Sequence, residues 1–246
     1  MREVIGRYRG SFLGLLWSFV NPVLMLAIYT FVFGFVFKAR WGQGDIDQYQ
    51  FALVLFTGLI IFNLFSECIS RAPGLILANI NYVKKVVFPL EILPWVALGS
   101  NLFHAGINLL VLLIFMLLLG QPFCWSMLYL PLILLPFLLL IMGLSWLLAS
   151  IGVFIRDVGQ FIGMTMTMLM FMSPIFYPLS ALPEAFQPYL LLNPVTLIVE
   201  QTRNTLLWGV EPNWQALGIY SIFALTIAWF GWFWFAKTRK GFADVL

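Results

Sequence analysis

The chain has 246 residues, of which 62% are hydrophobic and 9% are charged, and its mean hydropathy is +0.98. This composition excludes an ordinary soluble domain and indicates a polytopic membrane protein with a single domain. A helix needs about 20 apolar residues to cross a bilayer core of about 30 Å, so the chain has room for roughly six spans and little else. The net charge of +3 comes from cations spread among short loops, which does not support nucleic-acid binding.

The first 18 residues mix Arg2, Arg7 and Arg9 with apolar side chains. This mixture is typical of a helix that lies in the membrane surface rather than across the bilayer. We therefore expect an interfacial helix over residues 1–18, on the cytoplasmic face.

Apolar segments follow that can each serve as a membrane span. We expect an all-α polytopic membrane protein with six transmembrane helices over residues 21–37, 51–69, 95–119, 128–154, 161–176 and 214–236. The fourth and fifth are separated by residues 156–160 alone, which predicts antiparallel neighbours.

A polar interruption over residues 70–94 separates the second span from the third. We expect a short helix there, held outside the bilayer, because apolar residues share one helical face: Ile76, Ile80 and Val83. Lys84 and Lys85 lie where cations favour a helix C-terminus, and Pro89 stops the helix. Such a segment suits contact with a partner, whereas an ordinary basic loop is the alternative.

Residues 179–213 contain four prolines, so no continuous span fits. A helix over residues 194–207 is too short to cross, which favours a re-entrant or surface element that forms an external gate. Thr196, Glu200 and Arg203 share one face of that helix. Glu200 and Arg203, three residues apart, are expected to form an exposed pair on a polar face directed toward the exit.

The orientation follows from the positions of the cations. If both termini, the 70–94 segment and the hairpin near Arg156 share one side, that side carries ten of the thirteen Lys and Arg residues. By the positive-inside rule, this side is the cytoplasm.

Catalytic signatures are missing from the sequence. It has no phosphate-binding G-x-x-x-x-G-K-[ST] loop and no H-E-x-x-H or G-x-S-x-G motif, so no catalytic residue, metal site or cofactor is expected in this chain. Asp45 and Asp47 lie in a short loop, where solvation is a simpler interpretation than metal binding. His104, with Asn101 and Asn108 at neighbouring turns, fits a polar contact between helices better than a proton site.

Aromatic residues make up 17% of the chain. Many tryptophans fall near predicted span ends, as interfacial belts require. Four aromatic residues in or at the ends of the first and fifth spans can stack on sugar rings and line a polymer path: Tyr29, Phe33, Phe171 and Phe176. Met168, in the methionine-rich fifth span, offers a surface that repacks easily. Contact with lipid or ordinary packing is the alternative for each.

Residues 81–89 read NYVKKVVFP and residues 91–94 read EILP. Together they closely resemble the cytoplasmic coupling segment in membrane subunits of ABC-2 type exporters, especially those that move O-antigen, capsule or teichoic-acid polysaccharide. Further stretches with the same resemblance occur in order along nearly the whole chain: 7–17, 149–160, 173–178 and 193–209. Members of this family usually begin somewhat earlier, so we expect a short N-terminal extension to be missing.

The resemblance implies a homodimer that forms a continuous channel in the bacterial inner membrane, with both termini cytoplasmic. Two copies of a separate ATPase would bind ATP and Mg and dock beneath it, and lipid-linked polysaccharide, with O-antigen favoured, would be pushed outward. It assigns the ATPase contact to Asn79, Ile80, Tyr82, Val83, Lys84, Lys85, Arg156 and Asp157. It also places the first and fifth spans beside the conduit and the 179–213 segment at its outer end.

Three other functions remain open. Export of a drug or a lipo-oligosaccharide is the nearest alternative within the family. A proton-coupled carrier would need a titratable group near the middle of the bilayer, and a membrane-embedded enzyme would need a nucleophile and base or a metal site. The identity and length of the polysaccharide are not specified by the sequence.

Overall fold

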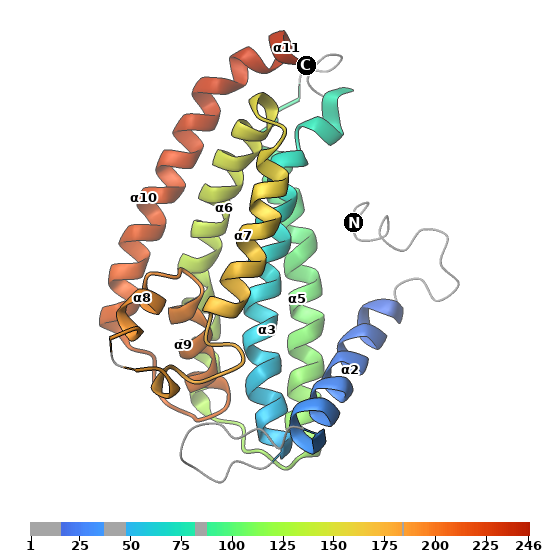
Figure 1. Ribbon diagram of the computed structural model, residues 1–246, viewed down its shortest axis with the longest axis vertical. Coiled ribbons are helices and arrows are strands. Elements are labelled where there is room, and N and C mark those ends of the chain that lie inside the picture. Colours follow the sequence, from blue (N-terminus) through green and yellow to red (C-terminus); the bar gives the residue numbers. More distant parts are fainter. Residues whose placement is uncertain (1–15, 37–47, 82–87, 184) are drawn as a thin grey trace. The chain divides into compact units, whose positions relative to one another are not determined.

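The computed structural model describes residues 16–36, 48–81, 88–183 and 185–246, and the regular structure within these ranges is entirely helical (Figure 1). The long helices are α3 (Gln48–Arg71), α5 (Ile92–Leu118), α6 (Leu130–Phe154) and α10 (Trp214–Thr238). The shorter ones are α2 (Trp17–Tyr29), α7 (Val158–Met172), α8 (Gln187–Leu191), α9 (Thr196–Leu206) and α11 (Phe242–Val245). Thr30–Val36 continues α2 as a π-helix, and 3-10 turns occupy Ala72–Gly74, Leu77–Asn79, Trp125–Tyr129, Leu179–Ala181 and Arg239–Gly241.

Four of the described helices are long and apolar enough to cross a membrane: Tyr49–Gly74, Ile92–Leu118, Trp125–Phe154 and Trp214–Gly241, three of which include an adjoining 3-10 turn. α2 and α7 are apolar but shorter. At about 1.5 Å per residue, the 27 residues of α5 extend about 40 Å, whereas the 15 residues of α7 extend about 22 Å. The all-α polytopic class is therefore confirmed, while the count of six spans stays a prediction.

The predicted interfacial helix lies almost wholly outside the described residues, which begin at residue 16. The 179–213 segment contains short helices and turns where it is described, and the 11 residues of α9 extend about 16 Å. This length agrees with the expectation that no continuous span forms there.

The chain divides into two compact units. Unit 1 comprises Met1–Asn63, Leu102–Pro131 and Leu169–Pro212, and unit 2 comprises Leu64–Asn101, Leu132–Met168 and Asn213–Leu246. The predicted gate segment belongs to unit 1, except for Asn213. The described parts of the predicted coupling segment, the α6–α7 hairpin and the C-terminus belong to unit 2.

The core of unit 1 forms around the first half of α3, where every residue from Phe51 to Phe62 is buried. Two other helices of this unit end at glycines that adopt φ +67°, Gly120 after α5 and Gly209 after α9. That left-handed conformation suits glycine, and it returns the chain so that Gln121 N–H donates to the Met116 carbonyl at 3.0 Å. These glycine turns therefore end α5 and α9.

In unit 2, α6 and α10 lie side by side (Figure 1). A Cβ on Gly143 of α6 would lie 2.6 Å from the backbone of Ala228, and a Cβ on Gly231 of α10 would overlap the backbone of Gly143. Small residues thus allow backbone contact, the usual device for packing helices in a membrane.

Candidate functional site

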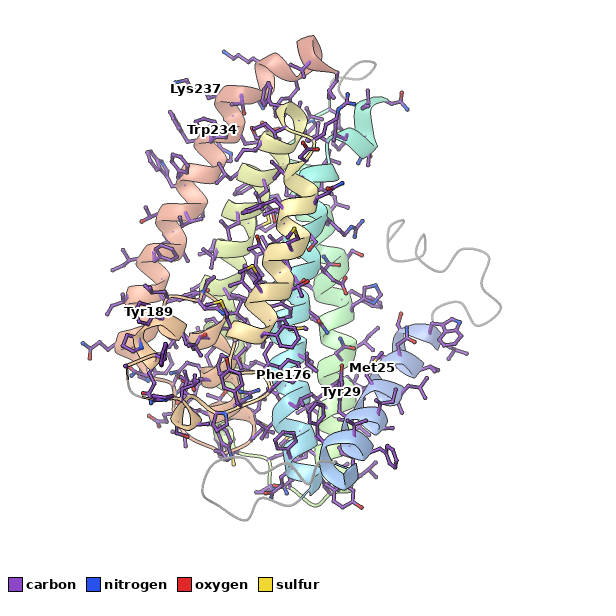
Figure 2. All side chains as sticks on the ribbon, viewed as in Figure 1. Met25, Tyr29, Phe176, Tyr189, Trp234 and Lys237 are labelled. Atoms are coloured by element: carbon purple, nitrogen blue, oxygen red, sulfur yellow. The ribbon has the colours of Figure 1, made fainter. Side chains whose placement is uncertain are left out.

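Four of the predicted conduit residues form one aromatic cluster in unit 1. The ring centroid of Phe33 lies 6.5 Å from that of Tyr29 and 6.3 Å from that of Phe176, and the Phe176 and Phe171 centroids lie 6.0 Å apart. Phe51 joins the cluster through Phe33 at 5.8 Å. Tyr29 is on α2, and Phe176 lies in the segment that follows α7 (Figure 2). The fold therefore brings together aromatic residues from the two segments that the resemblance placed beside the conduit.

The fifth conduit residue, Met168, lies on α7 and belongs to unit 2. Its side chain is 62% exposed and that of Phe171 is 61% exposed. Phe161 and Met164 are also exposed, so residues at spacings of three and four form an uncovered stripe along α7. This stripe is available to lipid, to a second subunit or to a passing polymer.

A small cavity in unit 1 has a volume of about 50 Å³ and is lined by Gln50, Leu53, Val54, Gln121, Leu207 and Trp208. Ligand pockets typically measure about 300–1,000 Å³. This cavity is therefore too small for a polymer path, and the aromatic cluster together with the exposed stripe of α7 is the better candidate.

Arg203, predicted to lie on an exposed gate surface, is instead 1% exposed. Its Nε donates to the Val54 carbonyl on α3 at 2.9 Å, its Nη2 donates to the Ile175 carbonyl at 3.0 Å, and its Nη1 donates to the Pro174 carbonyl. Because α7 ends at Met172, the carbonyls that follow it are released from helical hydrogen bonding and accept from the guanidinium. The expected exposed pair is thus wrong: Arg203 connects α9 to α3 and to the segment after α7.

Glu200, one turn before Arg203 on α9, is half-buried. Burial raises the pKa of the Glu200 carboxyl, and the charge of Arg203 opposes that shift. Burial likewise lowers the pKa of Arg203 to about 9, opposed by Glu200, so the guanidinium stays positive at neutral pH. Thr196 is fully buried, so the three predicted gate residues do not present a common polar surface.

Three residues that the sequence analysis missed support this arrangement. A Cβ on Gly58 of α3 would lie 2.5 Å from Nη2 of Arg203, so glycine makes room for the guanidinium. Asn193 donates to the Ser173 hydroxyl at 2.8 Å, and Ser173 donates to the Leu169 carbonyl at 2.6 Å. Ser173 and Asn193 each precede a proline, and a polar residue before proline was the available signal that a helix stops there.

The coupling segment is described only in part. Tyr82, Val83, Lys84 and Lys85 lie outside the described residues, so their predicted contact role is not tested. The described residues before Tyr82 include two short 3-10 turns, Ala72–Gly74 and Leu77–Asn79. Ile76, between the two turns, is fully buried, whereas Ile80, after the second turn, is 36% exposed.

Asn79 donates its side-chain amide to the Leu75 carbonyl at 2.9 Å, which makes it part of the turn itself. Arg156 and Asp157 are exposed at the α6–α7 connection. That connection and the Leu77–Asn79 turn lie at the same end of unit 2 (Figure 1). Four of the eight predicted coupling residues therefore belong to one end of a single unit.

Helix α6 anchors both flanks of the coupling segment within unit 2. Gly152 packs directly against the backbone of Pro73, near the start of the 70–94 segment. Trp146 donates its indole N–H to the Glu91 carbonyl at 3.1 Å, near the end of that segment. The segment between these two contacts is therefore fastened at both ends to one helix.

One other polar residue of the spans, Asn101, forms an ordinary contact. Asn101 donates to the sulfur of Cys68 at 3.1 Å in unit 2, as expected for a polar contact between helices. Among the described residues, no group of three or more His, Cys, Asp or Glu side chains is placed to hold a metal, and Asp45 and Asp47 lie outside that part of the chain.

Comparison with known proteins finds a matching family and several similar chains. Residues 1–207 match the model of the ABC-2 type transporter family. The chain is 28% identical to the O-antigen export system permease protein RfbA of Myxococcus xanthus, over 99% of this chain and 92% of that protein. It is also 28% identical to the protein of the same name from Klebsiella pneumoniae, over 98% and 90%. The polysialic acid transport protein KpsM of Escherichia coli is 28% identical over 94% of this chain and 88% of that protein.

Proposed function

Because the chain belongs to the ABC-2 type transporter family, we propose that it is the membrane subunit of an exporter of cell-surface polysaccharide. The observation that carries this proposal is the likeness, over nearly the whole chain, to relatives named for O-antigen export and polysialic acid transport. Lipid-linked O-antigen is the favoured substrate, because the O-antigen permeases match with the longest coverage.

The chain performs transport and leaves ATP hydrolysis to a separate subunit, since its sequence contains no phosphate-binding loop. Two copies of an ATPase bind ATP and Mg and contact the coupling segment. Because α6 holds both flanks of that segment at Gly152 and Trp146, a displacement of the segment is passed to α6 and to the start of α5. Rigid connected elements of this kind carry conformational coupling.

The polymer passes beside the aromatic cluster and the exposed stripe of α7. Aromatic faces stack on the C–H faces of sugar rings without requiring one particular sugar sequence, which suits a repeating chain. Two copies of this subunit, each with six spans, enclose the path in the bacterial inner membrane, with both termini in the cytoplasm. The segment with α8 and α9 stands at the outer end.

The coupling role is tested by charge at Ile80. Ile80→Asp introduces a carboxylate where an apolar contact with the ATPase is proposed, so it should lower ATPase retention by tenfold or more, because an unpaired buried charge costs about 2–5 kcal/mol at an interface. Asn81→Asp, an exposed neighbour with the same added charge, is the matched control. Each variant is co-expressed with the ATPase, purified, and assayed for bound ATPase, ATP turnover and polysaccharide at the cell surface. Normal retention and normal export in the Ile80→Asp variant would remove this segment from the mechanism.

The orientation is tested by thiol labelling in intact cells, with Cys68 and Cys124 replaced by serine. A cysteine at Tyr189, which is 65% exposed on α8, should react with a membrane-impermeant maleimide, whereas one at Lys240 should react only after the cells are opened. Labelling of position 240 from outside would reverse the topology.

The conduit is tested by truncating its aromatic side chains. Phe171→Ala together with Phe176→Ala should reduce the amount or the length of surface polysaccharide at normal expression. The control is Phe223→Ala, an exposed aromatic side chain on α10 in unit 2. Unchanged polysaccharide in the double variant would assign these rings to packing.

A further inference from the structure

The end of α10 makes a set of contacts that the proposed function does not yet use. After α10, the chain turns through Arg239–Gly241 and places Phe242, which is fully buried, against two aromatic rings. The Phe242 centroid lies 5.5 Å from that of Phe235 on α10 and 5.9 Å from that of Phe154 at the end of α6. This packing fixes the direction in which the turn leaves the helix.

A hydroxyl pair fixes the last residue of α10. Thr238 donates to the Trp234 carbonyl at 2.8 Å, and Ser150 of α6 lies 2.7 Å from the same Thr238 hydroxyl. Because the one proton of Thr238 is used within its helix, Ser150 is the donor between the two. The end of α10 is thereby tied to α6 one turn from Phe154.

The turn directs Arg239 to the exit of the coupling segment. Its Nη1 pairs with Oε1 of Glu91, whose backbone carbonyl accepts from Trp146. The second carboxylate oxygen of Glu91 is buried and has no hydrogen-bond partner in the part of the chain that the structure describes. The carboxylate therefore depends on Arg239 for compensation of its charge.

The three cations of this region have different positions. Lys237 and Lys240 are exposed, and neither forms an ion pair with another described residue. Lys237 lies near Trp234 on the outer surface of α10 (Figure 2). Arg239, in contrast, pairs with Glu91. A requirement for positive charge near a membrane surface would be met by any of these three residues. It therefore does not explain why Arg239 pairs with Glu91.

We propose that Arg239 is a positioning residue for energy coupling: with Thr238 and Phe242 it forms a C-terminal brace that holds Glu91, the exit of the coupling segment, against α6 and α10. The inference rests on the proposed function, since it assigns a role to a contact between that segment and the transport helices. When the ATPase displaces the segment, the brace makes α5 and α10 follow together. Without the brace, Glu91 moves relative to α6 and α10. Only part of the displacement of the segment then reaches α5 and α10.

The test measures polysaccharide exported per ATP hydrolysed, with the complete transporter in cells and in purified form. Arg239→Gln and Glu91→Gln should each lower this ratio about two- to five-fold, the change that corresponds to losing about 0.4–1 kcal/mol, while the amount of bound ATPase stays normal. Arg239→Lys, which keeps the charge, should restore most of the ratio. Lys237→Gln, which removes an exposed charge less than one turn away, should leave the ratio unchanged.

The outcomes separate coupling from simple stabilisation. If Arg239 merely stabilised the fold, Arg239→Gln would lower the amount of folded protein but not the polysaccharide exported per ATP, and the brace would be rejected. An equal loss of polysaccharide exported per ATP in Lys237→Gln would reject the brace and indicate that general surface charge is responsible. If the wild-type chain retained no ATPase at all, the proposed function would fail and the brace with it. If the wild type couples ATP hydrolysis to export and only the Arg239→Gln and Glu91→Gln variants export less polysaccharide per ATP, the proposed function and the brace are both supported.

Discussion

Two arginines in the two units of this protein serve different purposes, and the difference lies in their partners. Arg203 in unit 1 is 1% exposed and donates to three backbone carbonyls. The side chain of Arg239 in unit 2 is 46% exposed and pairs with the carboxylate of Glu91. The first supplies donors to the carbonyls of Pro174 and Ile175, which follow the end of α7, and a further donor to Val54 within α3. The second forms an ion pair that water partly screens.

Arg203 should therefore matter mainly for stability, whereas Arg239 should matter mainly for function. Carbonyls buried at the end of a helix have no alternative partner, so the fold depends on the guanidinium that reaches them. A half-exposed ion pair contributes little to stability, so its value lies in where it holds the chain. Unit 1 should therefore respond to substitutions through unfolding, and the brace region of unit 2 through coupling.

The largest effect is expected at Arg203. Arg203→Ala leaves the carbonyls of Val54, Pro174 and Ile175 without this donor, and should cost about 3 kcal/mol or more of unfolding free energy. Arg203→Lys should fall between alanine and the wild type, because one ammonium group cannot reach three carbonyls as a planar guanidinium does. Thermal unfolding of the purified protein in nanodiscs measures the effect. Arg156→Ala, an exposed arginine, is the control, and an equal melting temperature in all variants would contradict this account.

A smaller effect is expected at Gly58. Because an added Cβ would lie 2.5 Å from Nη2 of Arg203, and that group is held by hydrogen bonds, Gly58→Ala should cost about 1–3 kcal/mol. The same change at Gly106 on α5, where nothing lies within 4 Å of an added Cβ, should be neutral or stabilising. In an Arg203→Ala background the cost of Gly58→Ala should largely vanish, and full additivity of the two changes would refute direct contact as its cause.

Arg239→Gln should destabilise the protein by only about 0.2–1 kcal/mol, despite its larger effect on coupling. The melting temperature should shift slightly, and high salt should reduce the difference from the wild type because the pair is partly exposed. A loss of stability as large as that of Arg203→Ala would remove the contrast between the two regions.

The smallest effect is expected at Glu200, with a sign opposite to that of a stabilising ion pair. Because burial raises the pKa of this carboxyl more than Arg203 lowers it, ionisation is disfavoured in the folded state. Stability should therefore rise slightly as the pH falls from above the raised pKa toward the ordinary value, and Glu200→Gln should abolish that slope. At neutral pH the Gln variant should equal or exceed the wild type by up to about 0.5 kcal/mol, as a melting series between pH 4 and 8 would show. A clear destabilisation would support the ion pair predicted from the sequence.

The conduit and gate parts of the candidate site were predictable from the sequence to different degrees. The aromatic residues at the conduit lie in apolar segments whose type and approximate position follow from local hydropathy, and the fold brings Tyr29, Phe33, Phe171 and Phe176 together. The gate residues were placed on the correct helix, but spacing along α9 could not show that Arg203 points into the fold. Its partner Val54 lies 149 residues away in sequence, so no local pattern carries the contact.

The sequence by itself determined the membrane class, the helical segments, the missing phosphate-binding loop and, through its resemblance, the family. These properties depend on composition, on hydrophobic runs and on short motifs, all of which are local. The tertiary structure decided which cations are buried, where helix ends need donors, and which residues hold the flanks of the coupling segment at Gly152, Trp146 and Arg239. These properties depend on groups that meet only after the chain has folded, because a carbonyl needs a distant donor only where its own helix has ended and water is excluded.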